Sequence, residues 1–169
     1  NLFKEFADSI GADVDMNQMY GTLYNKALEG DADCGGILSY GNYAGEPITN
    51  VEKGRPMVVR TPETKFTLAN FMRSHLYTAL GVIKVGMDIL TKDEGVEIDT
   101  VLGHGGLFKT KGVGQKILAD AINTPVVVME TAGEGGPWGM AILAEYMVKR
   151  AEGEKLEDYL KNKVFGSNA

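Results

Sequence analysis

The chain has 169 residues, of which 44% are hydrophobic and 24% charged, which is enough apolar material for one globular core and predicts a single main domain. A net charge of −6 with scattered lysines and arginines argues against a nucleic-acid surface, and the sequence shows neither a bilayer-spanning apolar run nor a secretory leader, so we expect no membrane attachment. The single cysteine, Cys34, cannot form an internal disulfide and has no partners at zinc spacing, which predicts a cytoplasmic protein without a structural metal.

The first third of the chain is predicted to hold two helices and two short strands. Residues 2–10 form an amphipathic run without a leader or a cap, so we expect the chain to be part of a larger protein. Asp15 is expected to cap a helix over residues 16–28 that ends at Gly30. Strands are predicted at residues 36–40 and, as an edge strand, 56–59.

Two acidic residues, Asp31 and Asp33, lie in the glycine-flanked turn that follows the second helix. Such a pair could be a two-carboxylate catalytic site. Aspartate side chains in turns, however, usually accept hydrogen bonds from their own backbone. We therefore interpret both residues as turn formers.

The longest predicted helix begins after the cap Thr67 and continues to about Thr91. Its apolar residues recur at helical spacing and predict a core helix: Leu68, Phe71, Met72, Leu76, Ala79, Leu80, Ile83, Met87 and Leu90. Gly81 and Gly86 lie inside it and each costs about 1 kcal/mol relative to alanine, so we expect close packing to compensate. His75, beside the stripe, is interpreted as a packing residue.

The rest of the chain alternates between strand and helix. Strands are predicted at residues 98–102 and 125–130, and helices at 115–123 and 137–151, the last with an apolar packing face. This alternation predicts parallel strands in an α/β fold, with binding at the carboxyl ends of the strands. We place the main domain at residues 1–151 and a charged terminal helix or extension at 152–169.

Two glycine-rich turns follow these strands, at residues 103–114 and 131–139, and are expected to form opposite sides of one crevice. The first is the best candidate site, because glycine lets a ligand approach the backbone. It is not a dinucleotide motif, since Phe108 stands where the last glycine of G-x-G-x-x-G belongs, and it lacks phosphate-loop spacing. A structural turn that binds nothing is the alternative interpretation.

The ordered segments of this half resemble a known family. Residues 98–106 (IDTVLGHGG), 115–121 (QKILADA), 124–128 (TPVVV) and 139–144 (GMAILA) follow one another as in the carboxyl-terminal domain of FGGY carbohydrate kinases, nearest to xylulokinase-like and ribulokinase-like members. Residues 38–46 resemble the family's PYLSGE loop, and 66–80 the helix after it. The resemblance implies an actin-like, ribonuclease-H-like ATPase fold, and we expect an incomplete domain.

By this resemblance the first glycine turn would hold the adenosine part of ATP. Gly105 and Gly106 would lie against the nucleotide, Leu107 would flank the adenine, and Thr110 would make a polar contact. The sequence departs from the family at His104, which occupies the third position of the usual triple glycine, and at residues 136–140, where Trp138 is either a packing residue or a ligand contact. The loop before Gln115 is also longer than usual.

The family's catalytic aspartate and its Gly-Thr phosphate hairpin both precede the matched region and have no counterpart here. The resemblance therefore implies an ATP-dependent, Mg²⁺-requiring kinase that phosphorylates a pentulose-like sugar, of which this chain alone is expected to be inactive. Family members are often homodimers, which the resemblance allows here. A non-catalytic actin-like nucleotide-binding or interaction module is the alternative function, since one fold hosts many functions.

Overall fold

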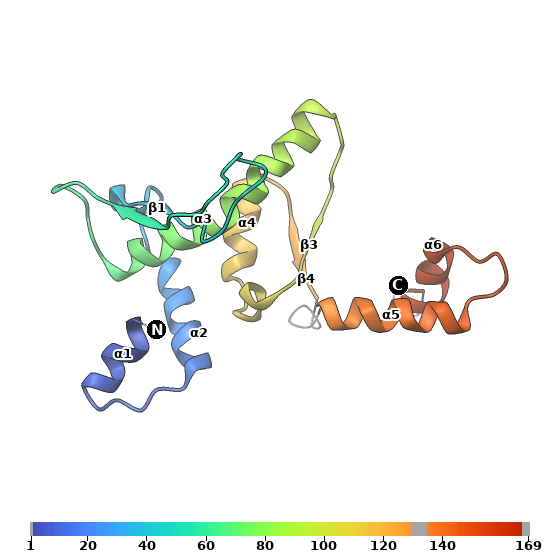
Figure 1. Ribbon diagram of the computed structural model, residues 1–169, viewed down its shortest axis with the longest axis horizontal. Coiled ribbons are helices and arrows are strands. Elements are labelled where there is room, and N and C mark those ends of the chain that lie inside the picture. The colour runs from blue at the N-terminus through green and yellow to red at the C-terminus, as the bar shows by residue number, and fades with distance from the viewer. Residues whose placement is uncertain (1, 130–134, 167–169) are drawn as a thin grey trace.

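The computed structural model describes residues 2–129 and 135–166, and its elements follow the predicted order (Figure 1). The helices are α1 (Leu2–Ser9), α2 (Met16–Ala27), α3 (Leu68–Asp88), α4 (Val113–Ile122), α5 (Gly135–Lys149) and α6 (Leu156–Tyr159), and the strands are β1 (Leu38–Tyr40), β2 (Met57–Val59), β3 (Val101–Gly103) and β4 (Val126–Val128). Within the described residues no helix is both long and apolar enough to cross a membrane.

The strands form two separate pairs. β1 and β2 are antiparallel, with Leu38 opposite Val59, and β2 is exposed as expected of an edge strand. β3 and β4 are parallel, with Val101 opposite Val126, and α4 provides the connection between them. The predicted parallel α/β unit is thus confirmed, although each strand has only three residues and is shorter than predicted.

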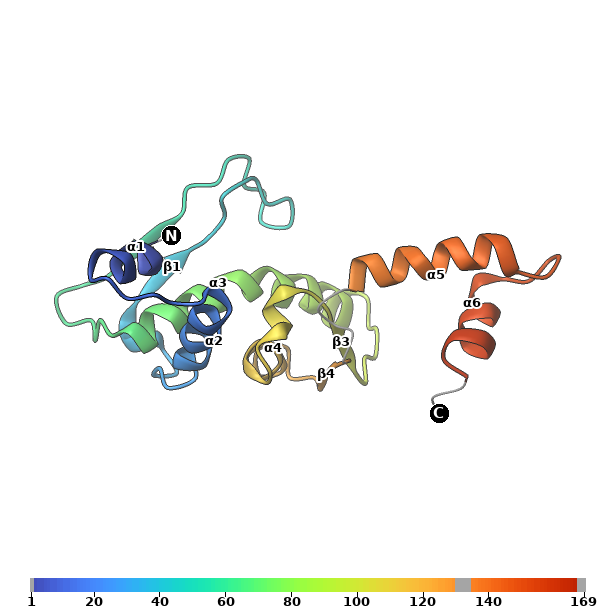
Figure 2. The same cartoon turned by 90° about the horizontal axis from the view of Figure 1, so that it is seen from below.

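The core surrounds the long helix α3, which packs against α2 and α4 (Figure 2). Its buried members come from four elements: Leu23 and Ala27 of α2, Met72, Leu76 and Leu80 of α3, Val113, Ile117 and Leu118 of α4, and Val126 of β4. Since β4 contributes to this cluster and β3 pairs with β4, the same core fixes the parallel strand pair.

Only part of the apolar stripe of α3 is buried in the core. Thr67 caps the helix as predicted, its hydroxyl accepting a hydrogen bond from the Asn70 backbone N–H at 3.2 Å. The helix ends at Asp88 and continues as one π turn (Ile89–Asp93). Leu80 is still buried, but Ile83 and Leu90 are each 43% exposed, so the prediction of a core stripe is wrong beyond Leu80.

The two glycines inside α3 do not both meet a close neighbour. A Cβ added at Gly86 would lie 3.7 Å from Ile48, an ordinary contact, but one added at Gly81 would meet nothing within 4 Å. The prediction that close packing compensates is therefore wrong for Gly81. That residue lies beside an open groove between α3 and α4.

The two aspartates of the turn after α2, Asp31 and Asp33, make different contacts. Asp33 accepts a hydrogen bond from the Gly35 N–H at 2.9 Å and caps the 3₁₀ turn Cys34–Gly36, which confirms its interpretation as a turn former. Asp31 forms an ion pair with Lys65 at 2.9 Å and accepts a hydrogen bond from the Asn70 side chain at 3.0 Å. These two partners, Lys65 first, lower the pKa of the Asp31 carboxyl.

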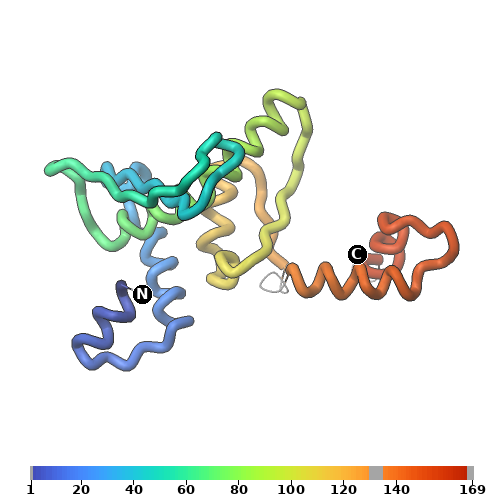
Figure 3. The backbone as a smooth tube through the Cα atoms, viewed as in Figure 1, coloured from blue at the N-terminus to red at the C-terminus, as the bar shows by residue number. Residues whose placement is uncertain are grey.

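α5 and α6 form a separate arm next to the β3–β4 pair, as the backbone trace shows (Figure 3). Two aromatic pairs lie within the arm. The ring centroids of Trp138 and Phe165 are 5.9 Å apart, and those of Tyr146 and Tyr159 are 5.3 Å apart. The predicted packing face of α5 is wrong as a core face. Met140, Leu143, Met147 and Val148 are 48–84% exposed, and no described residue of this helix is buried.

Candidate functional site

The glycine-rich turn begins at the carboxyl end of β3, where the sequence predicted it. Gly103 closes the strand, Gly105 has φ +113°, and a 3₁₀ turn (Gly106–Lys109) leads toward α4. The φ of Gly105 lies in the region that only glycine enters at low cost, so the turn depends on this residue. A Cβ at Gly105 or Gly106 would meet nothing within 4 Å, which leaves this backbone uncovered.

Two apolar side chains attach the turn to the core. A Cβ added at Gly114 would lie 2.8 Å from the Leu107 side chain, and one at Gly103 would lie 2.7 Å from the Phe108 ring, so each glycine makes room for one anchor. Leu107 and Phe108 are partly buried and pack against the core cluster. Because both side chains pack against the core, neither covers the backbone at Gly105 and Gly106.

A cleft of about 300 Å³ lies between this turn, the start of α4 and the end of β4. Its lining residues are Phe108, Thr110, Lys111, Gly112, Gln115, Val128 and Met129. The Gln115 side chain donates a hydrogen bond of 2.6 Å to the Val126 carbonyl and so joins α4 to β4 at the base of the cleft. The cleft thus lies at the carboxyl end of parallel strands, where α/β proteins bind ligands.

Of the four predicted contact residues, one lines this cleft. Thr110 is in its wall, whereas Gly105, Gly106 and Leu107 lie on the segment just before it. The sequence reasoning did not single out Gln115 or Lys111 as wall residues. Their position in the sequence could have indicated them. Lys111 lies two residues before α4 and Gln115 lies in its first turn, directly after a glycine-rich turn.

The second glycine-rich turn approaches the first at one point. Residues 131–134 of this predicted site lie outside the described residues, but Gly135, at the start of α5, lies against His104: a Cβ there would be 2.7 Å from the imidazole Nδ1. His104 therefore borders the place where the two turns meet. Trp138 packs on Phe165, which agrees with the packing interpretation of this tryptophan.

The polar side chains that line the cleft are those of Thr110, Lys111 and Gln115. α4 begins after Gly112 without a side-chain cap, and the N–H of its first residue, Val113, donates to the Thr110 carbonyl at 3.3 Å. Among residues 2–129 and 135–166 no group of three or more His, Cys, Asp or Glu side chains could hold a metal ion. The described residues thus provide donors for a ligand and no metal cluster.

Comparison with solved structures finds the same architecture in several sugar and polyol kinases. Xylulose kinase from Rhodospirillum rubrum matches with a TM-score of 0.59 and 18% identity over 85% of this chain and 28% of that chain. Plasmodium falciparum glycerol kinase with ADP matches with a TM-score of 0.58 and 22% identity over 86% and 27%. Ligand-bound xylulose kinase from Lactobacillus acidophilus matches with a TM-score of 0.57 and 17% identity over 75% and 25%.

At these low identities the structural likeness shows a shared fold alone. The chain spans only about a quarter of the length of the matched structures. Among curated proteins, none matches the sequence. The family model of the carboxyl-terminal domain of FGGY carbohydrate kinases matches residues 2–148, nearly the whole chain. The chain therefore belongs to the FGGY family of carbohydrate kinases, and its fold is the carboxyl-terminal domain of these actin-like, ribonuclease-H-like ATPases.

Proposed function

We propose that this chain is the nucleotide-binding portion of an ATP-dependent kinase that transfers the γ-phosphate of ATP to a hydroxyl of a pentulose-like sugar. The observation that carries the proposal is the uncovered backbone at Gly105 and Gly106 beside a cleft lined by Thr110 and Lys111, in a chain that belongs to a carbohydrate kinase family. The glycerol kinase with the same fold was solved with ADP, which supports a nucleotide as the ligand.

The turn and the adjacent cleft together fit a nucleoside with its phosphates. The backbone at Gly105 and Gly106, just before the cleft, has room for a flat purine or a ribose, because no side chain lies within 4 Å of their Cβ positions. Thr110 offers a hydroxyl, and the Lys111 ammonium group favours negative charge. Leu107 is half-buried against Gly114, so any contact with adenine would use the exposed part of its side chain.

Catalysis is proposed to need residues beyond those described here. Phosphoryl transfer requires a bound Mg²⁺ and a base within reach of the acceptor hydroxyl. The described residues do not form a metal-binding group, so we assign neither Mg²⁺ nor the base to them, and we expect this chain by itself to bind ATP without transferring phosphate. We also propose a cytoplasmic location, where ATP is available and where Cys34, a buried free thiol, would stay reduced.

Nucleotide binding is tested by titrating the chain with a non-hydrolysable ATP analogue. Gly106→Val should weaken binding at least about tenfold, because the new side chain would occupy the surface on which the nucleotide lies. Gly21→Val is the matched control: its added Cβ also meets nothing within 4 Å, but it lies in α2, away from the turn. Equal affinities of the two variants would refute the site.

Phosphoryl transfer is tested separately on the complete protein encoded by the same gene. A complete protein that binds ATP and phosphorylates a ketopentose would support the kinase. ATP binding without transfer to any of a panel of sugars would favour a non-catalytic actin-like nucleotide-binding module, for which the same turn would suffice.

A further inference from the structure

The side chain of His104 packs directly on the first residue of α5. A Cβ added at Gly135 would lie 2.7 Å from the imidazole Nδ1, 3.0 Å from Cγ and 3.1 Å from Cβ, so its three nearest atoms all belong to His104. A real Cβ essentially never comes within 3.0 Å of another such atom, so a larger residue at position 135 would have to displace the imidazole. At the next glycine, Gly136, an added Cβ would meet nothing within 4 Å.

The backbone of His104 is held by the strand before it and the turn after it. Gly103 pairs with Val128 in the β3–β4 sheet, and the Phe108 ring fills the space beside Gly103. After His104, the Gly105 carbonyl accepts a hydrogen bond from the Phe108 N–H at 3.1 Å. The imidazole therefore stands on a fixed segment, where it is exposed and meets the start of α5.

α5 is not held in place by burial. No described residue of this helix is buried. Trp138 packs on Phe165, and the Tyr146 hydroxyl donates to the Glu154 carbonyl, so these contacts join the helix to the rest of its own arm. The position of α5 beside the glycine-rich turn therefore depends on contacts at its start, and the contact of Gly135 with His104 is one of them.

The residues that follow His104 are those on which the nucleotide is proposed to lie. Gly105 and Gly106 leave their backbone uncovered, and they are joined directly to the residue that supports α5. A ligand that restrains residues 105–106 also restrains His104 and the helix packed on it. When two events restrict the motion of one segment, the first lowers the entropic cost of the second, which makes them cooperative.

We propose that His104 is a positioning residue that couples nucleotide binding at the glycine-rich turn to the position of the α5–α6 arm. The inference rests on the proposed nucleotide-binding function and adds a regulatory link to it. The nucleotide restrains residues 104–106, and the imidazole transmits this restraint to Gly135 through their contact. Coupling between two sites is reciprocal, so a partner that holds the arm in this position raises the affinity for nucleotide by the same factor.

The link depends on a residue in which this chain differs from the usual pattern of its family. A glycine at position 104 would have no side chain to reach Gly135. The coupling is therefore expected in this chain and in relatives that carry a histidine at the same place, and to be absent where the third glycine is kept.

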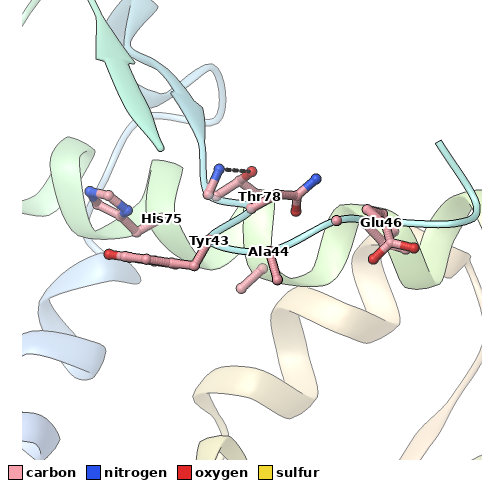
Figure 4. A pocket seen from close by; sticks show the side chains of 10 residues that line it. Tyr43, Ala44, Glu46, His75 and Thr78 are labelled. Atoms are coloured by element: carbon pink, nitrogen blue, oxygen red, sulfur yellow. Dashed lines mark hydrogen bonds between the residues drawn. The ribbon is translucent and has the colours of Figure 1, made fainter. Parts of the chain in front are cut away.

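The contact itself is tested without nucleotide, by NMR of a chain labelled with ¹³C-histidine. Gly135→Ala should shift the His104 signal, because the new methyl group displaces the imidazole. Gly136→Ala is the matched control, since it adds the same group to the same helical turn in open space and should leave the signal in place. His75, the other histidine, is the internal reference, because it lines a separate cleft between α3 and residues 41–46 (Figure 4).

The coupling is tested through Trp138, the single tryptophan of the chain, which lies in the first turn of α5. Titration with a non-hydrolysable ATP analogue should change its fluorescence with the Kd that calorimetry gives. In His104→Gly calorimetry should still show binding, about fivefold weaker, but the fluorescence should stay constant. His104→Gln, which restores a planar polar side chain, should recover part of the response. Gly135→Ala should lose the response and Gly136→Ala should keep it.

The outcomes separate this inference from the proposed function. If calorimetry detects no binding by the unchanged chain, the nucleotide site is refuted and the coupling with it. If the analogue binds without changing the Trp138 fluorescence, or if the change persists in His104→Gly, the coupling alone is refuted. Equal shifts of the His104 signal in Gly135→Ala and Gly136→Ala would overturn the contact on which it depends.

Discussion

The side-chain amide of Asn70 forms two hydrogen bonds with Asp31, one from each end of the amide. Its oxygen accepts from the Asp31 backbone N–H at 2.7 Å, and its nitrogen donates to the Asp31 carboxylate at 3.0 Å. The same nitrogen donates to the Lys65 carbonyl at 2.9 Å. Asn70 is 1% exposed, so this polar side chain is buried with its hydrogen-bonding groups paired, and it connects α3 to the turn after α2.

Asn70→Ala should lower the free energy of unfolding by about 2–4 kcal/mol, because it removes three hydrogen bonds from a buried site. The measurement is urea denaturation followed by circular dichroism. Asn25→Ala is the control. Asn25 is exposed and its side chain donates to the Gly21 carbonyl of its own helix, its one hydrogen bond within residues 2–129 and 135–166, so a loss of about 0.5 kcal/mol is expected there. Similar losses in both variants would contradict the role given to Asn70.

Gly35→Ala should destabilise the chain more than Gly95→Ala does. Both glycines have positive φ, +60° and +66°, so both substitutions carry a backbone cost of about 1 kcal/mol. Only at Gly35 would the new Cβ collide with the Asn70 amide and lie 2.8 Å from the Lys65 carbonyl, whereas Gly95 is open. The difference between the two melting temperatures measures this collision, and equal values would exclude it.

Acidification should destabilise the chain in part through Asp31. Its pKa is lowered in the folded state by Lys65 and Asn70, so the carboxyl stabilises the fold above its unfolded pKa of about 3.9, and this contribution is lost as pH falls through the lower folded value. Asp31→Asn should therefore flatten the dependence of stability on pH below about 4. Asp13→Asn alters an exposed carboxylate without an ion pair in the described chain, and should leave the curve unchanged.

Leu76→Ala should cost about 2–4 kcal/mol, and Leu143→Ala less than about 1 kcal/mol. Leu76 is 4% exposed in the core between α2 and α4, whereas Leu143 is 48% exposed on α5. The same substitution in two helices thus compares a core position with an arm position. A comparable loss at Leu143 would mean that α5 packs on the body of the domain in solution.

The order of elements could be predicted from the sequence because local signals determine it. Asp15 and Thr67 cap their helices as expected, since a side-chain oxygen before an apolar run satisfies a free N–H wherever the helix packs. The parallel pairing of β3 and β4 follows from the strand–helix–strand alternation.

What the sequence could not predict depends on which surfaces meet. The outer part of α3 and the apolar residues of α5 have the periodicity of core helices, but periodicity does not say whether a partner is present, and here Ile83 and Met147 are exposed. The burial of Asn70 was also missed, because Asp31, with which it forms two of its three hydrogen bonds, lies 39 positions away in the chain. The cleft at His75 was missed for the same reason: its wall consists of two segments distant in sequence.

The arm formed by α5 and α6 has a consequence for how the chain unfolds. No described residue of α5 is buried, and the parts of the arm are joined by two aromatic pairs and by polar contacts such as the hydrogen bond from the Tyr146 hydroxyl to the Glu154 carbonyl. The arm therefore lacks the buried apolar area that couples a helix to global unfolding. Its amide hydrogens should exchange with solvent through local opening, at rates independent of denaturant at low concentration. The amides of α3 and α4 should exchange only when the whole core opens.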